Sequence, residues 1–181
     1  MLKELYVTYI LLKHPTGLSL PVAKRIVRQV PALFKPLKLR VKYKLRTRIN
    51  TGPLPGTFED QRAQLKHWAD TIRLRPNSIT HVLAPPIMDT DGYSMGGLAY
   101  SGCKYKEGAI SVSNTYVRNQ YGENRFWHSI GAIAHEIGHN LGARHSNLGL
   151  MRSTVLWDVA AQYVPPLASD SRRQIKRCLQ K

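Results

Sequence analysis

The sequence predicts an α/β (α+β) fold, and two patterns in the chain of 181 residues carry this prediction. Residues 37–49 alternate between mostly apolar and charged side chains, which is typical of a strand with one buried face. Residues 124–140 place apolar side chains along one stripe at helical spacing. Strand-like and helix-like segments of this kind alternate along the chain. Because 43% of the residues are hydrophobic, we expect a single domain over residues 1–181.

The remaining elements follow from local patterns, taken in chain order. Tyr, Val, Thr and Ile favour a first strand over residues 5–12, and the lack of a small-residue cleavage site after it argues against a signal peptide. Pro21 suits the first turn of a helix whose apolar residues recur as far as Leu33. Further patterns predict a helix over 59–72, strands over 79–84, 98–101 and 109–114, and a helix over 171–179. No apolar run reaches about 20 residues, so we expect no transmembrane helix.

The segment 134–146 contains the residues that say most about function. On a helix, His135 and His139 lie one turn apart on the same face and can bind a single metal ion. Gly142 can end that helix in a left-handed conformation, which brings His145 back toward the same ion. Three imidazole ligands are typical of a catalytic zinc that keeps its fourth position open for water. The alternative interpretation is a polar helix end with three solvated histidines.

Glu136 supplies the acid and base chemistry that such a site needs. Zinc lowers the pKa of a bound water to about 7 and polarises a carbonyl oxygen. Glu136 accepts the proton of that water as general base and later passes it to the leaving amine. These residue types at this spacing therefore predict peptide-bond hydrolysis, with one zinc ion as cofactor and Glu136 as the catalytic residue.

The segment 135–145 resembles the metzincin clan of zinc endopeptidases, because it matches each fixed position of the motif His-Glu-x-x-His-x-x-Gly-x-x-His. Residues 138–142 are most similar to the adamalysin (reprolysin) and gametolysin-like branches, whereas Ser146 resembles the matrixins. The resemblance implies a twisted, mixed five-stranded sheet with long helices in an upper subdomain, residues 1–142. It also implies a small, irregular lower subdomain, residues 143–181, that ends in a C-terminal helix.

The resemblance also implies a methionine turn after the third histidine, for which Met151 is the candidate. In the clan this methionine forms an apolar floor beneath the zinc and is not a ligand. The alternative, Met151 as an ordinary core residue, predicts nearly the same packing. A calcium-binding loop could begin at Asp89, Asp91 and Gly92, but the later ligands of such a loop are missing from the sequence. An ordinary turn is therefore the favoured interpretation, and a calcium site has no further support.

Residues 96–103 resemble the Gly-Leu-Ala-x-x-Gly-x-Cys stretch of adamalysin-like domains, which forms the edge strand above the active-site cleft. An extended substrate can pair with the free main chain of such a strand. The substrate-binding residues implied here are Gly97, Leu98, Ala99 and Tyr100. An ordinary glycine-containing strand is the alternative.

The same resemblance implies a disulfide between Cys103 and Cys178. Closing the loop between them would stabilise the fold by about 4 kcal/mol in the chain-entropy model. A disulfide would favour an extracellular or otherwise oxidising compartment. Two buried free thiols remain the alternative.

The net charge of +16 is concentrated in the first 50 residues, which hold twelve Lys and Arg but a single acidic residue. In the strand predicted over 37–49, six cations share one face because side chains alternate along a strand. They are Lys38, Arg40, Lys42, Lys44, Arg46 and Arg48. This face must be exposed, and it can bind a polyanion such as an acidic glycan, a nucleic acid or an anionic surface. A solvated face that only keeps the protein soluble is the alternative.

The sequence as a whole predicts a monomeric zinc-dependent endopeptidase that acts on protein or peptide substrates. Two alternatives use the basic strand: a polyanion-binding module with a structural zinc, and a protease associated with nucleic acid. The intact Glu136 argues against the first, because a structural zinc site needs no general base.

Overall fold

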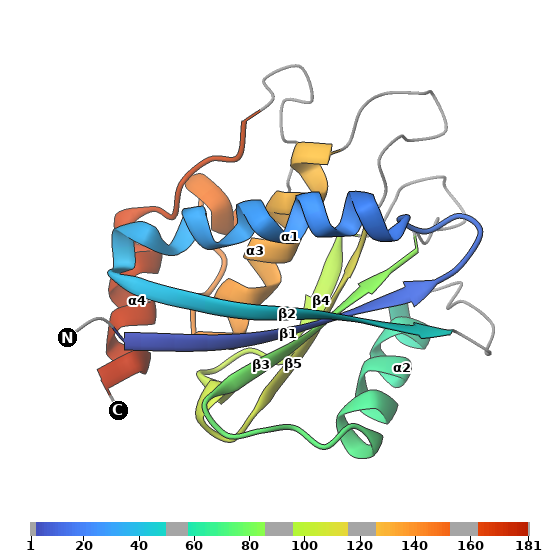
Figure 1. Cartoon of the computed structure of the whole chain (residues 1–181). Coiled ribbons are helices and arrows are strands. Elements are labelled where there is room, and N and C mark those ends of the chain that lie inside the picture. The colour runs from blue at the N-terminus through green and yellow to red at the C-terminus, as the bar shows by residue number, and fades with distance from the viewer. Residues whose placement is uncertain (1–2, 50–57, 86–95, 116–125, 153–162, 181) are drawn as a thin grey trace.

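The computed structural model describes residues 3–49, 58–85, 96–115, 126–152 and 163–180 (Figure 1). The possible calcium loop at 89–92 lies outside these residues. The strands are β1 (Lys3–Lys13), β2 (Leu39–Ile49), β3 (Ser78–Ala84), β4 (Gly97–Ala99) and β5 (Ala109–Asn114). The α-helices are α1 (Leu20–Phe34), α2 (Phe58–Thr71), α3 (Phe126–Asn140) and α4 (Ser169–Gln180). The described residues also form the short 3-10 helices η1 (Lys35–Leu37), η2 (Lys104–Lys106) and η3 (Gly149–Met151).

The five strands form one sheet in the order β2-β1-β3-β5-β4. β1 pairs in parallel with both β2 and β3, and β3 pairs in parallel with β5. β4 is antiparallel to β5 and forms the edge opposite β2. The mixed five-stranded sheet expected for this chain is therefore confirmed, and β2 and β4 are its two outer strands.

Helices cover both faces of the sheet (Figure 1). The larger core lies between the sheet and the pair α1 and α3, where β1 contributes Leu5, Val7, Tyr9 and Leu11. Alternate residues of the strands face the other way, and there α2 packs its Leu65 and Trp68 on β3 and β5. None of the described helices is both long and apolar enough to cross a bilayer.

Two strands are shorter than their sequence patterns suggest. The strand expected over 37–49 begins at Leu39, because η1 precedes it and Lys38 adopts a left-handed conformation with φ of 56°. The strand expected over 98–101 covers Gly97–Ala99, and positive φ angles at Gly102 and Cys103 turn the chain soon afterwards. In both places a left-handed residue interrupts extended geometry that the side-chain pattern alone would allow.

Candidate metal centre and active site

Helix α3 brings the first two histidines of the motif together. Apolar residues such as Ile133 and Ile137 fasten this helix into the core, and nearly all of it is buried. The Nε2 atoms of His135 and His139 lie 3.1 Å apart. The ring of His145 lies 5.4 Å from that of His135 and 4.7 Å from that of His139, measured between centroids. One ligand nitrogen from each of the three histidines falls within 4.8 Å of the other two.

The end of α3 explains how His145 reaches its neighbours. The N–H of Ala143 donates to the carbonyl of Gly138, and the N–H of Gly142 donates to that of His139. This pair of bonds is the Schellman helix stop, which requires a left-handed residue. Gly142 provides it with φ of 86°. The chain then reverses and returns His145 to the face of α3 that carries His135 and His139.

Backbone carbonyls orient two of the three rings. His135 Nδ1 donates to the carbonyl of Leu150, and His139 Nδ1 donates to that of Ala143, each at 2.8 Å. A carbonyl only accepts hydrogen bonds, so the proton lies on Nδ1 and the lone pair on Nε2. Burial lowers the pKa of His135, and burial together with the neighbouring His135 lowers the pKa of His139 to about 4. Both rings are therefore neutral at physiological pH.

These features fit a zinc ion. Zinc bonds imidazole nitrogens at about 2.0 to 2.1 Å, which places two ligands on a tetrahedron about 3.3 Å apart. The observed 3.1 Å between the two Nε2 atoms is close to this spacing. Metal-binding histidines also typically donate the other ring N–H to a carbonyl or carboxylate, as both rings do here. His135, His139 and His145 are thus the residues that would hold the metal.

Glu136 lies on α3 directly after the first histidine and is only 6% exposed. Burial raises the pKa of its carboxyl group to about 8. Its side chain packs against β4, because a Cβ atom added to Gly97 would lie 2.8 Å from Glu136 Cγ and 3.1 Å from Oε1. The structure therefore places the predicted catalytic residue between the histidines and the predicted substrate strand.

The predicted substrate residues lie on the open edge of the sheet. Gly97, Leu98 and Ala99 are partly buried and pair with β5, and Tyr100 is 39% exposed. In the described part of the chain, no strand pairs with the other side of β4. Asn140, which sequence reasoning missed, fixes this segment by donating from Nδ2 to the carbonyls of Tyr100 and Ile110. The only sequence feature that pointed to Asn140 was a polar amide side chain next to the apolar stripe of the predicted helix.

Met151 is fully buried beneath α3. Its Sδ lies 2.6 Å from where a Cβ of Gly138 would stand, so Met151 packs directly on the residue before His139. Its carbonyl accepts a hydrogen bond from the N–H of Ser146 at 2.8 Å, which closes the loop after the third histidine. This position agrees with the predicted floor, although ordinary core packing would place Met151 there too.

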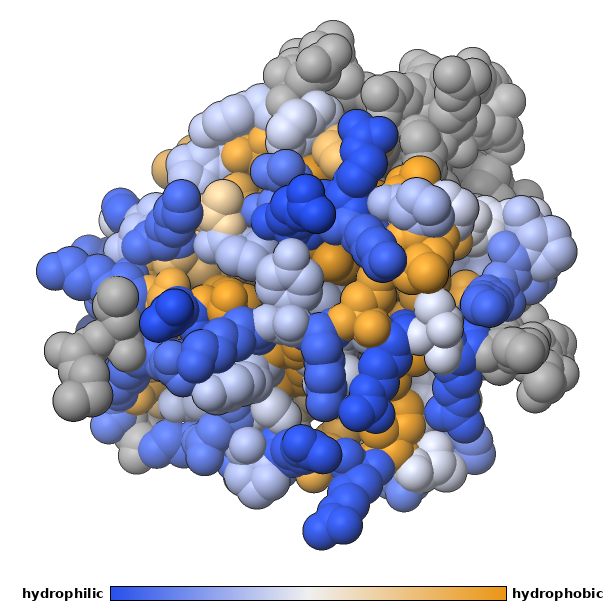
Figure 2. All heavy atoms as spheres, viewed as in Figure 1, coloured by the Kyte–Doolittle hydropathy of each residue, from blue (hydrophilic) through white to orange (hydrophobic). Residues whose placement is uncertain are grey.

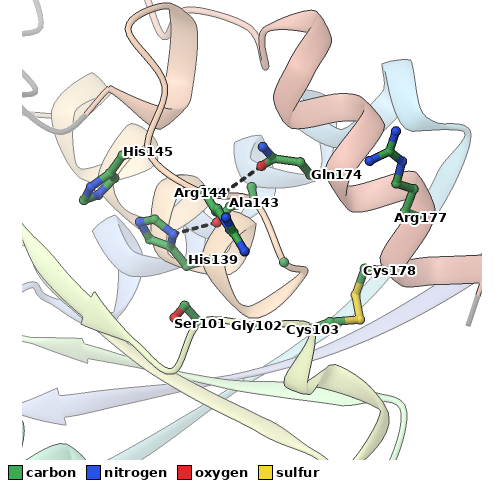
Figure 3. Close-up of a pocket in the computed structure, with 11 residues that line it drawn as sticks. Ser101, Gly102, Cys103, His139, Ala143, Arg144, His145, Gln174, Arg177 and Cys178 are labelled. Carbon is green, nitrogen blue, oxygen red and sulfur yellow. Dashed lines mark hydrogen bonds between the residues drawn. A yellow bond between two sulfur atoms is a disulfide. The ribbon is translucent and has the colours of Figure 1, made fainter.

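Cys103 and Cys178 form the disulfide that the resemblance implied, with their Cα atoms 5.5 Å apart. It joins the end of the β4 segment to α4. Next to it, a pocket of about 770 Å³ extends from the disulfide to His139 and His145 (Figure 3). Arg144, Gln174 and Arg177 also line this pocket, and no sequence signal had singled them out.

The fold and the histidine cluster define a metzincin-like zinc-peptidase domain. The family model of the M12B reprolysin-like metallopeptidases matches residues 25–146, which is more than half of the chain. The protein belongs to that family. A comparison with curated proteins finds no match.

Solved structures agree on the fold. Metalloproteinase-II from Bacteroides fragilis superimposes with a TM-score of 0.69 at 18% identity over 99% of this chain. Archaemetzincin from Methanopyrus kandleri does so with a TM-score of 0.60 at 14% identity, over 99% of this chain and 96% of its own. This chain spans only 54% of the Bacteroides structure.

Proposed function

We propose that this protein is a zinc-dependent endopeptidase that cleaves peptide bonds within protein substrates. The observation that carries the proposal is the position of Glu136, a buried carboxyl group between three converging histidines and an open strand edge. A site that only stabilised the fold would need no general base beside its metal ligands.

Metal binding and proton transfer are assigned to different residues of the chain. His135, His139 and His145 would hold a zinc ion, which would supply the Lewis acidity that activates water at neutral pH and polarises the peptide carbonyl. Glu136 accepts the proton from the attacking water. Burial raises the pKa of Glu136, whereas the positive charge of a bound zinc ion would favour the carboxylate form that accepts a proton. The same group then delivers the proton to the nitrogen of the leaving amine.

The free edge of β4 orients the substrate. An extended peptide that adds to this edge forms main-chain hydrogen bonds and lies beside Glu136, because Gly97 contacts that side chain. The absent side chain of Gly97 lets the strand approach Glu136 closely. Main-chain pairing makes few demands on substrate side chains, so we expect cleavage of many sequences.

The test is cleavage of a quenched fluorescent peptide library by the wild type, by Glu136→Gln and by Glu59→Gln, with the zinc content of each determined. Glu59 is an exposed acid on α2, on the face of the sheet away from the histidines, and serves as the matched control. We expect stoichiometric zinc in all three proteins and cleavage by all except Glu136→Gln. Full cleavage by Glu136→Gln would overturn the mechanism, and zinc without any cleavage would favour a binding module.

A second candidate function rests on the exposed cations of β2. Arg40, Lys42, Lys44, Arg46 and Arg48 project from one face of this strand and are exposed. Of these five, only Lys42 forms an ion pair within the described residues, with Glu4 at 2.7 Å. Charge repulsion from Arg46 and from Arg75 in the loop after α2 contributes to lowering the pKa of Lys44. Hydrophilic side chains cross the surface over β1 and β2 (Figure 2).

We infer that this row attaches the enzyme to a linear acidic glycan. Cations at alternate strand positions repeat about every 6.6 Å in a straight line, which suits a chain of regularly spaced anionic groups. Single-stranded nucleic acid needs aromatic side chains on which bases stack. Among the described residues of β1 and β2, Tyr6 is the aromatic side chain beside these cations, and it already donates to Glu4 and packs under Lys42.

Retention on heparin and on single-stranded DNA columns across a salt series tests this inference. The variant Lys44→Gln/Arg46→Gln is compared with Lys24→Gln/Arg28→Gln, which removes the same charge from exposed positions of α1. We expect only the β2 variant to elute from heparin at clearly lower salt. Equal elution of the two variants would indicate a generic effect of charge. Stronger retention on DNA than on heparin would favour nucleic acid.

A further inference from the structure

The pocket beside the histidines has walls from three separate parts of the chain (Figure 3). One wall is the segment 101–103 that follows β4, the second is the loop 142–145 after α3, and the third is α4. The Cys103–Cys178 disulfide joins the first and third walls. One wall begins at Ser101, soon after β4, and the pocket reaches two of the three histidines, so a peptide that pairs with β4 beside the histidines would extend toward this pocket.

The walls are held in place. The N–H of Arg144 donates to Gln174 Oε1 at 2.8 Å, which fastens the loop after α3 to α4. Gly142 packs on the disulfide, since a Cβ atom added there would lie 3.3 Å from Cys178 Cβ and 3.5 Å from Cys103 Cβ. The side chains of Arg144 and Arg177 are therefore carried on backbone that is anchored on both sides of the pocket.

The described side chains that line this pocket carry positive charge only. Arg144 and Arg177 line it, and among the described residues none of those that line it is acidic. Neither guanidinium belongs to an ion pair within the part of the chain that the structure describes. A second cavity next to His145 has the opposite character, because Asp170 lines it and no Lys or Arg does within the part of the chain that the structure describes. The positive charge is therefore a local property of the first pocket, on one side of the histidines.

We propose that Arg144 and Arg177 bind a carboxylate of the substrate, so that the enzyme prefers chains with an acidic group on one side of the cleaved bond. The inference rests on the proposed peptidase function. Guanidinium groups suit this role because their planar N–H groups match the two oxygens of a carboxylate. The carboxylate belongs either to an Asp or Glu side chain or to the end of the substrate chain.

The test uses quenched peptides with both ends blocked, in which each of the four positions on either side of the bond is in turn Glu, Gln or Lys. We expect wild-type kcat/KM for Glu to exceed that for Gln by about three- to tenfold at positions on one side only, since the pair is solvent-exposed. The Arg144→Gln/Arg177→Gln variant should bring this ratio close to one, because neither new side chain carries a charge that distinguishes Glu from Gln. Arg144→Glu/Arg177→Glu should reverse the preference in favour of Lys.

Lys176→Gln is the matched control, because Lys176 is exposed and adjacent to Arg177 on α4 but does not line the pocket. It should keep the wild-type ratio. A Glu to Gln ratio near one in the wild type, or an unchanged ratio in the double variant, would overturn the proposal. A further peptide without acidic side chains is measured with a free and with an amidated C-terminus. This comparison shows whether the carboxylate comes from a chain end or from a side chain.

A binding measurement separates this proposal from the proposed function. Fluorescence polarisation of labelled Glu and Gln peptides on zinc-loaded Glu136→Gln, with and without the two arginine substitutions, reports the pocket without turnover. If no peptide is cleaved by the wild type, the peptidase function fails, and the Glu to Gln ratio of the two Kd values still tests the pocket. Equal Kd values for both peptides would overturn it.

Discussion

The two outer strands of the sheet differ in length, charge and surroundings. β2 extends over 11 residues, pairs with β1 along its whole length and projects five cations from one face. β4 has three residues, none of them charged, and its Gly97 contacts the buried Glu136. Charge on an edge strand prevents another strand from pairing with it, whereas a neutral edge accepts one. The difference favours β4 over β2 as the edge at which the proposed peptide substrate would pair.

The largest expected effect comes from the disulfide that anchors the β4 side. In Cys103→Ser/Cys178→Ser the loop of 75 residues is no longer closed, which should lower the free energy of unfolding by about 2 to 4 kcal/mol. Urea denaturation measures this loss. As a comparison on the β2 side, Lys42→Gln breaks the exposed pair with Glu4 and should change stability little. If the two variants were equally stable, the β4 side would not depend on the disulfide.

The second-largest effect is expected from a methyl group added at Gly97, which should disturb β4. The added Cβ would lie 2.5 Å from the Val112 carbonyl oxygen and 2.8 Å from Glu136 Cγ, so the strand or the carboxylate must move. We expect Gly97→Ala to lose about 1 to 3 kcal/mol of stability and to show a greatly reduced kcat/KM. Gly96→Ala is the control, because its Cβ meets no atom within 4 Å. Equal activity of the two variants would contradict the close approach of β4 to Glu136.

The centre of the sheet, between the two edges, should respond to pH. His81 on β3 is fully buried, its Nδ1 bonds Ser111 Oγ at 2.7 Å, and burial lowers its pKa to about 3. The unfolded chain takes up a proton below about pH 6.5 while the folded chain does not. Stability should therefore fall by about 1.4 kcal/mol per pH unit from this group as the pH drops from 6.5 toward 3.

The comparison for this prediction is His81→Asn, whose amide can keep the hydrogen bond to Ser111. Free energies of unfolding are measured by urea denaturation between pH 7 and pH 4 for both proteins. The difference between wild type and variant should shrink as the pH falls, because only the wild type loses the contribution of His81. Parallel pH profiles would show that His81 takes up its proton equally in the folded and unfolded chains.

The smallest effect on stability should follow from removing charge at the β2 edge. Lys44→Thr/Arg46→Thr replaces two exposed cations with a residue that favours strands, so the free energy of unfolding should change by less than about 0.5 kcal/mol. The edge should instead become self-associating, which light scattering over a concentration series detects. Lys24→Thr/Arg28→Thr on α1 should remain as monodisperse as the wild type. Association of the α1 variant alone would contradict the role given to the β2 cations.

The sequence predicted best those features that depend on residues close together in the chain. His135, His139 and Gly142 lie within eight positions, so helix geometry and one left-handed glycine are enough to anticipate the cluster with His145. The strict alternation of β2 likewise predicted its cationic face. The catalytic role of Glu136 and the substrate role of β4 stay predictions, because geometry places these residues but does not test their chemistry.

Features that arise from packing between distant segments were not predictable in this way. Arg144 and Arg177 line one pocket only because α4 packs against the loop after α3, and no local pattern reports that contact. The amide of Asn140 bonds carbonyls some 30 and 40 positions earlier. The parallel pairing of β2 with β1 and its place at the edge also depend on the arrangement of the whole sheet.

The position of α4 in the chain has a consequence for how the site is made. During synthesis the three histidines leave the ribosome before α4, which carries Gln174, Arg177 and Cys178. The three candidate metal ligands therefore precede one wall of the neighbouring pocket and the disulfide partner in the chain. The pocket beside the histidines is therefore complete only after α4 has packed against the loop that follows α3.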